Sequence, residues 1–338
     1  MEYSAPPRYI VAGPLTIDFR VLPRQVPLLK VPGGAALYAA AGLRVWTSEV
    51  GLLSRVGCDY PREWVAAMEK HDLNTRGISI LPSPQDVRFF AAYNEQGGIL
   101  DENPVGIFAR LGSPFPKELL DYSFAPPGID NRTLLSPLAV RAGDIPSDYL
   151  DAAAAHICPM DFLAQQLLPS TFRQGHITTI TLDPSPGAMN PVFWNDIPSA
   201  LNGLTAFLAA EDDLRTLFQG KTDDIWEMAE TLAHFDCEIV VIRRGTAGQL
   251  LYDASRRRRW AVPAYPTRLI DPTGAGSAFS GGFLAGWRSS YDPLQAVLQG
   301  NISASLVIES SDVFYAMDAM PGLGAARLEA LKSQVRIL

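Results

Sequence analysis

The sequence predicts an α/β fold in which a central, mostly parallel β-sheet is flanked by helices. Strand-like apolar runs alternate with helical segments along most of the chain, a pattern typical of a parallel sheet covered on both faces. Hydrophobic residues make up 47% of the 338 residues, which is enough for a large core. A glycine-rich turn at 274–276 opens an apolar helix near the end of the chain.

The first half of the chain starts with a β-branched run, Tyr9–Ala12, which ends at Gly13 as a buried strand would. Further strands are expected at 15–21, 49–57 and 86–94, and helices at 33–46 and 61–73. Residues 99–146 are rich in Pro, Gly and Asp and show no sustained period. We therefore expect an irregular insertion there, with a few short elements.

The strand–helix alternation resumes after this insertion. Strands are expected at 154–160, 177–183, 204–210 and 238–244, with helices between them at 161–168, 195–202 and 222–235. A hairpin-like passage then leads into the glycine-rich turn, and two more helices are expected at 276–288 and 293–308.

The net charge, the cysteines and the N-terminal sequence indicate which partners and which cellular location to expect. The net charge is -8 without a long acidic block, which argues against general affinity for nucleic acid or an anionic membrane. The three cysteines are far apart, as in reduced thiols of a cytosolic protein. The N-terminus lacks the pattern of a signal peptide, and no apolar run is long enough to span a bilayer. We expect a cytoplasmic protein with no nucleic acid and no membrane as partner.

The turn IDPTGAGSAFSGGF, residues 270–283, indicates a site for phosphate or another oxyanion. The first N–H groups of a helix have no internal partner, and Gly274 and Gly276 let an anion approach them closely. A plain structural turn would explain the same glycines. A dinucleotide fingerprint is disfavoured because Phe279 stands at its third glycine, and a P-loop because no G-x-x-x-x-G-K occurs.

The order of these features resembles the ribokinase, or PfkB, family of carbohydrate and nucleoside kinases. The family signature D-T-x-G-A-G-D-x-F-x-x-G is similar to D-P-T-G-A-G-S-A-F-S-G-G at 271–282. The family's glycine pair before an Ala-rich helix, with V-G-x-D downstream, is similar to VPGGAALYAAAGLRVW and VGCDYP. The resemblance covers nearly the whole chain and implies a single ribokinase-like domain over residues 1–338.

The resemblance also implies an activity. It implies transfer of phosphate from ATP, with Mg²⁺, to an alcohol group of a sugar or nucleoside. A small β-sheet lid over the substrate would come from residues 14–31 and 86–112. Because family members often dimerise through their lids, the resemblance also favours a homodimer.

Four residues are implied in binding the sugar or nucleoside. Asp18 sits where the family's acidic residue binds hydroxyl groups, and a carboxylate accepts such hydrogen bonds well. Gly33 and Gly34 would let the sugar lie against the backbone. Tyr38 stands near the place of a sugar-binding Asn in many members, which is a departure from a ribokinase-like polar pocket. A solvated strand carboxylate and a simple helix start are the alternatives for Asp18 and the two glycines.

The phosphate site carries the main departure from the family. Gly274, Ala275 and Gly276 would supply backbone donors to the transferring phosphate, and the family's catalytic base, the Asp of G-A-G-D, is Ser277 here. A serine hydroxyl is not a base at neutral pH, and a positioned base contributes roughly 10²–10⁴-fold to the rate. Asp271 and Thr273 fall where members bind a monovalent cation or shape the anion site, and Thr273 adds a hydroxyl near the nucleotide.

The resemblance also implies residues that bind the metal and the nucleotide, although the family's motif for the metal is only partly present. In place of the family's N-x-x-E motif the chain has Ala210 and Asp213, within FLAAEDDL. Glu211 and Asp213 would hold Mg²⁺, which takes carboxylates and waters, although an acidic helix start is the alternative. The nucleotide would lie over Gly245, Gly248 and Asn301. Two functions therefore stay open: an attenuated kinase, and an inactive family member that binds nucleotide or sugar in a regulatory or scaffolding role.

Overall fold

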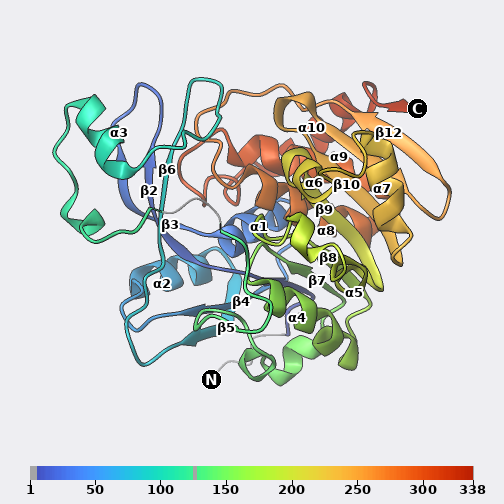
Figure 1. Ribbon diagram of the computed structural model, residues 1–338, viewed down its shortest axis with the longest axis horizontal. Helices are drawn as coiled ribbons and strands as arrows, with labels where there is room; N and C mark the ends of the chain where they lie inside the picture. The colour runs from blue at the N-terminus through green and yellow to red at the C-terminus, as the bar shows by residue number, and fades with distance from the viewer. Residues whose placement is uncertain (1–5, 125–127, 338) are drawn as a thin grey trace.

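The computed structural model describes residues 6–124 and 128–337, so the first five residues and part of the expected irregular insertion lie outside it. The main sheet has the strand order β13-β12-β11-β10-β9-β8-β7-β1-β4-β5, and a smaller sheet has the order β3-β2-β6. Figure 1 shows the smaller sheet and α3 as a separate lobe at the upper left of the molecule.

The main sheet is parallel from β5 to β10. Its parallel strands are β1 (Tyr9–Ala12), β4 (Val50–Val56), β5 (Leu73–Ile80), β7 (Ala154–Ile157), β8 (Thr179–Leu182), β9 (Leu204–Ala210) and β10 (Cys237–Arg243). The remaining strands, β11 (Gln249–Asp253), β12 (Arg258–Val262) and β13 (Arg336–Ile337), continue the sheet in antiparallel pairs. The predicted mostly parallel sheet is confirmed.

Helices cover both faces of this sheet because successive strand residues point to opposite sides. In β1, Val11 belongs to one buried cluster and Ile10 to the other. The first cluster is covered by α1 (Ala35–Arg44), α2 (Arg62–Lys70), α8 (Ala275–Ser290), α9 (Pro293–Val307) and α10 (Leu323–Lys332). The second is covered by α4 (Phe162–Gln174), α5 (Ile197–Leu201), α6 (Glu211–Leu217) and α7 (Ile225–Ala233).

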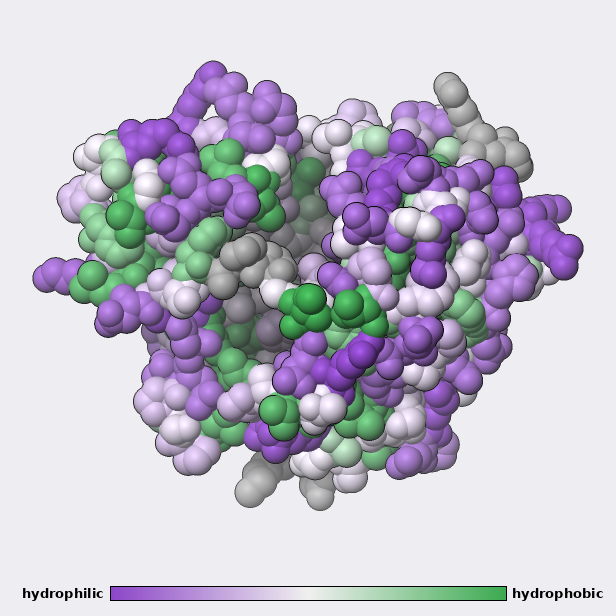
Figure 2. Space-filling model, viewed as in Figure 1, coloured by the Kyte–Doolittle hydropathy of each residue, from purple (hydrophilic) through white to green (hydrophobic). Residues whose placement is uncertain are grey.

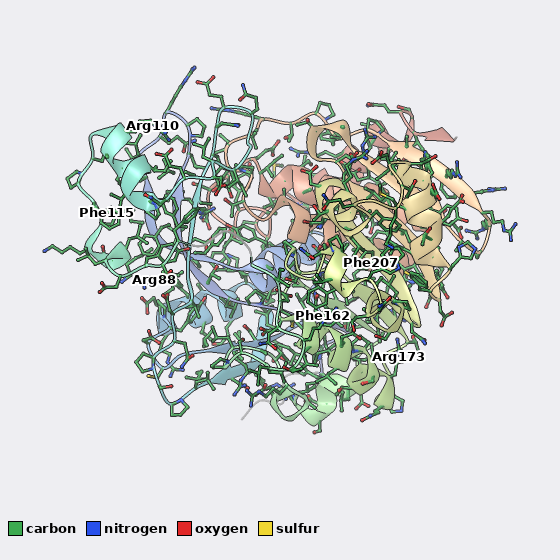
Figure 3. All side chains as sticks on the ribbon, viewed as in Figure 1. Arg88, Arg110, Phe115, Phe162, Arg173 and Phe207 are labelled. Carbon is green, nitrogen blue, oxygen red and sulfur yellow. The ribbon has the colours of Figure 1, made fainter. Side chains whose placement is uncertain are left out.

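The small sheet has an apolar cluster of its own. Strand β2 (Thr16–Val21) pairs antiparallel with β3 (Leu28–Gly33) and parallel with β6 (Arg88–Ala92). Phe19, Phe90 and Phe108 are buried together between this sheet and α3 (Pro104–Leu111). Figure 3 labels Arg88, Arg110 and Phe115 in this lobe, and Phe162 and Phe207 in the main body. This arrangement is consistent with a lid.

Several elements of the structure were not predicted from the sequence, and one helix is longer than predicted. Strand β5 was missed because LNTRGISI is polar and lies at the sheet edge, and α10 and β13 were missed near the C-terminus. Helix α4 continues through Pro169 to Gln174, since Leu168, Pro169 and Phe172 are buried on one side of it. The described part of the expected insertion contains α3 and short 3₁₀ turns at Lys117–Leu119 and Ala142–Asp144.

No helix within residues 6–124 and 128–337 combines the length and the apolar character needed to cross a membrane.

Candidate active site

The glycine-rich turn lies at the carboxyl edge of the parallel strands. Helix α8 starts just after Gly274 and packs against β7 and β8. It also contacts the side chain of the residue that follows β8 and that of the last residue of β10. Open α/β sheets bind their ligands at this edge. Figure 2 shows the surface hollowed between the lobe that carries α3 and the part that carries α6 and α7.

The first turn of α8 presents backbone donors that the helix itself does not use. The Ala275 N–H binds the Pro272 carbonyl at 3.2 Å, and the Ala278 N–H binds the Gly274 carbonyl at 2.8 Å. The N–H groups of Gly276 and Ser277 lie between these two bonds, where a helix has no internal acceptor. Together with the helix dipole, they favour an anion. The half-buried Ser277 side chain stands in the same turn.

Arg243, the last residue of β10, brings a positive charge to this turn. Its Nη1 donates to Asp183 Oδ2 at 2.7 Å and its Nη2 to Asp183 Oδ1 at 2.6 Å. A Cβ on Gly276 would lie 2.7 Å from Arg243 Nη1, so glycine is what lets the guanidinium lie against the turn. An arginine in such a position can stabilise charge on a transferring phosphoryl group.

Two residues of the small-sheet lobe form hydrogen bonds with the segment just before the glycine-rich turn. The buried Arg20 of β2 donates from Nη1 to the Asp271 carboxylate and, at 2.9 Å, to the Tyr38 hydroxyl. The Thr273 hydroxyl donates to Tyr93 Oη at 2.8 Å. The structure therefore brings Tyr38, Asp271 and Thr273 together, and it packs the Tyr38 ring against Gly274.

Asp18 is buried beneath the start of α1. Its Oδ1 accepts from the Thr16 hydroxyl at 2.5 Å, and only a glycine at position 33 leaves room for the carboxylate. Burial raises the pKa of Asp18 to about 6, because the Thr16 hydrogen bond and the Arg20 charge offset only part of the desolvation. Gly34, with a φ of 102°, is the N-cap of α1.

The acidic residues that follow β9 differ in whether they form ion pairs. Glu211 pairs with Arg215 at 2.6 Å and with Arg244 at 2.9 Å, and its hydrogen bond to Arg215 is the main reason that its pKa is lowered. Asp213 has no ion pair among the described residues, and burial, followed by the Asp183 charge, raises its pKa to about 6. Asp213 is therefore better suited to receive Mg²⁺ than Glu211.

Among the described residues, no group of three or more His, Cys, Asp or Glu side chains is placed so that it could hold a metal ion. Mg²⁺ commonly needs only one or two carboxylates, with waters and substrate phosphates completing its shell. The Asp213 carboxylate fits that mode of binding.

Besides Thr273, three residues were expected at the nucleotide, and the fold already uses the side chain of one of them. Gly245 begins the short 3₁₀ turn after β10, Gly245–Ala247, and Gly248 follows it. Asn301 is buried in α9, where its amide donates to Gln249 Oε1 and the Pro263 carbonyl and accepts from the Tyr265 N–H. The Asn301 side chain thus joins α9 to β11 and the segment after β12.

Sequence reasoning missed Arg20, Tyr93, Asp183 and Arg243. Asp183 and Arg243 fall within the last two residues of the expected strands 177–183 and 238–244, and ligand-binding groups of α/β sheets commonly follow strand ends. Arg20 lies two residues after Asp18 and so on the same face of β2. No local signal marks Tyr93, because its partner Thr273 is distant in sequence.

Known proteins resemble the chain in both sequence and fold. The model of the pfkB family carbohydrate kinases matches residues 158–319. A cytidine kinase from Thermococcus kodakarensis is 28% identical over 285 residues, which cover 82% of this chain and 87% of that protein.

Two solved structures illustrate the fold. An E. coli protein assigned as a ribokinase II, in complex with ATP and Mg²⁺, superimposes with a TM-score of 0.70 at 16% identity, covering 97% of this chain and 99% of the other. A double mutant of fructokinase from Vibrio cholerae, with fructose, ADP and potassium ion bound, has a TM-score of 0.66 at 19% identity, with coverages of 97% and 99%. Residues 158–319 therefore carry a pfkB family carbohydrate kinase domain, and the chain as a whole has a fold similar to ribokinase-like structures.

Proposed function

We propose that this protein is an ATP- and Mg²⁺-dependent kinase that phosphorylates an alcohol group of a sugar or nucleoside, and that the absence of an Asp at position 277 slows it. The observation that carries the proposal is the first turn of α8, which offers the Gly276 and Ser277 N–H groups and whose Gly276 lies against the Arg243 guanidinium. The likeness to a cytidine kinase and to structures with ATP or fructose supports this class of substrates.

The acceptor is an alcohol that meets Asp18 and Arg20. Asp18 Oδ2 and Arg20 Nε are both buried without a hydrogen-bond partner in the described structure, and they lie 3.9 Å apart. A hydroxyl can donate to the carboxylate oxygen and accept from the guanidinium at once. Gly33 and Gly34 border this position at the start of α1.

The donor binds at the first turn of α8. ATP supplies the phosphoryl group when it is bound. Gly274, Ala275 and Gly276 form the turn that receives the phosphate, Arg243 neutralises part of its charge, and Asp213 holds Mg²⁺. Gly245 and Gly248 stay the candidates for contact with the rest of the nucleotide, whereas Thr273 and Asn301 act through the hydrogen bonds that hold the fold.

Location and assembly form part of the same proposal. The three cysteines are free, which supports a reducing compartment such as the cytoplasm. Phe89 of β6 is 38% exposed on the face of the small sheet that carries Asp18, and we propose that two copies pair through this face. Light scattering should then give a dimer mass, and Phe89→Lys should reduce it to that of the monomer.

Nucleotide binding is tested separately from catalysis. A non-hydrolysable ATP analogue with Mg²⁺ should raise Tm, because a ligand that binds only the folded state stabilises it. Gly276→Ala should remove most of that shift, since its Cβ would meet Arg243 at the phosphate turn. Gly143→Ala is the matched control, because nothing lies within 4 Å of its Cβ. An equal shift in both variants would place the nucleotide elsewhere.

Catalysis is tested at Ser277. Ser277→Asp should raise phosphotransfer to the best-binding sugar or nucleoside by at least about tenfold in excess Mg²⁺, within the range of a positioned base. Acceptor binding should change little, because the gain belongs to the transition state. Turnover by the parent near ten per second, an ordinary rate for enzymes, would contradict the proposed attenuation.

The alternative is an inactive protein that binds nucleotide or sugar in a regulatory or scaffolding role. The observation that favours it is the Tyr38 ring, which packs against Gly274 at the phosphate turn. If both ligands bind and Ser277→Asp still gives no turnover, this alternative replaces the kinase.

A further inference from the structure

The guanidinium of Arg20 is surrounded by oxygen atoms that accept its hydrogen bonds. The Arg20 side chain is 1% exposed. Nη1 donates to the Tyr38 hydroxyl and to the Asp271 carboxylate, and Nη2 donates to the Ser311 carbonyl oxygen at 2.9 Å. These acceptors come from α1, from the segment before α8 and from the segment after α9. A buried charge is tolerated only with such pairing.

Both carboxylate oxygens of Asp271 already accept a hydrogen bond, and one of these bonds brings the positive charge of Arg20. Asp271 Oδ1 accepts from the Thr273 N–H at 2.9 Å, and Asp271 Oδ2 accepts from Arg20. Its backbone is also fixed, because the Ile270 and Asp271 N–H groups both bind the Ile308 carbonyl. A free monovalent cation at this carboxylate, as the family resemblance implies, does not fit while Arg20 is present.

We propose that the Arg20 guanidinium acts as the built-in monovalent cation of this site and makes it independent of K⁺. The fixed charge neutralises Asp271 and joins the lid strand β2 to the turn that receives phosphate. The effect of this charge on activity rests on the proposed kinase function, whereas its effect on cation binding and stability does not.

The chemistry of the oxygen atoms around Arg20 predicts what its removal would do. An Arg20→Ala variant would leave the Asp271 carboxylate, the Ser311 carbonyl and the Tyr38 hydroxyl around a space with a buried negative charge. Carbonyl and carboxylate oxygens are the groups that replace the hydration shell of hard cations, including K⁺. The variant should therefore gain a K⁺ requirement that the parent lacks.

The test compares Tm in KCl, LiCl and choline chloride at equal ionic strength. The parent should have the same Tm in all three salts. Arg20→Ala should be least stable in choline chloride, and KCl should raise its Tm saturably by at least about 2 °C. Arg24→Ala is the matched control: Arg24 belongs to the same lid region but is exposed and pairs with Glu95, so its Tm should not respond to K⁺.

Further variants keep the test decisive if Arg20→Ala does not fold. Arg20→Lys keeps a cation and should stay insensitive to K⁺, and Arg20→Ala with Asp271→Asn removes both charges and should also be insensitive. A saturable, K⁺-selective rise in Tm of the parent would overturn the proposal, as would a folded Arg20→Ala that ignores K⁺. If K⁺ stabilises Arg20→Ala but neither protein phosphorylates any acceptor, the cation proposal stands and the kinase proposal fails.

Discussion

At the scale of single residues, Asp18 combines deep burial with the carboxylate that we propose binds the alcohol group. Its pKa is raised to about 6, first by burial, so the carboxyl holds its proton more tightly in the folded chain than in the unfolded one. The folded state binds the extra proton between about pH 4 and 6, and the stability from this group is therefore present at low pH and lost as pH rises through 6.

Asp18→Asn should separate the stability of Asp18 from its role in binding. Its free energy of unfolding relative to the parent should increase by about 1–3 kcal/mol between pH 4 and pH 7, as denaturant titrations at several pH values would measure. In the parent, kcat/KM for the acceptor should fall below pH 6 as the carboxylate is protonated, and Asp18→Asn should lose most of it throughout. A flat stability difference would mean that Asp18 has an ordinary pKa.

At the scale of elements, the Arg243–Asp183 pair joins the ends of β8 and β10 to α8. Arg243→Met should cost about 3–5 kcal/mol, because it leaves the Asp183 carboxylate buried without its partner. Adding Asp183→Asn should restore most of that stability, as denaturant midpoints would measure. Phosphotransfer should stay low in the double variant, since no positive charge faces Gly276.

Two results would contradict this account of the pair. A double variant as unstable as Arg243→Met would mean that packing, and not the unpaired charge, causes the loss. A double variant with full activity would remove Arg243 from the phosphate site.

At the scale of the whole molecule, the lid and the main body should unfold together as one domain. The lid cluster around Phe19, Phe90 and Phe108 is small, and each buried aromatic contributes about 1.5–3 kcal/mol. Arg20 and Tyr93 also tie the lid to the turn before α8. Calorimetric and van't Hoff enthalpies should therefore agree. A separate early transition, seen by calorimetry, would instead make the lid an independent unit.

The sequence by itself determined the alternating strands and helices, and with them the parallel sheet. These follow from local periodicity: the run Tyr9–Ala12 and the helix after Gly274 are readable without any distant contact. The family signature also predicted Gly274, Gly276 and Ser277 as site residues, because a turn at the start of a helix is built from neighbouring residues.

Only the tertiary structure decided which charges meet at this turn. Arg20 and Asp271 are 251 positions apart, and Arg243 and Asp183 are 60 apart, so no periodicity links them. It also decided that Glu211 is neutralised by Arg215 and Arg244 while Asp213 is not, and that the Asn301 amide is used within the fold. The physical reason is that burial and electrostatic pairing depend on distance in space, which the order of residues along the chain does not encode locally.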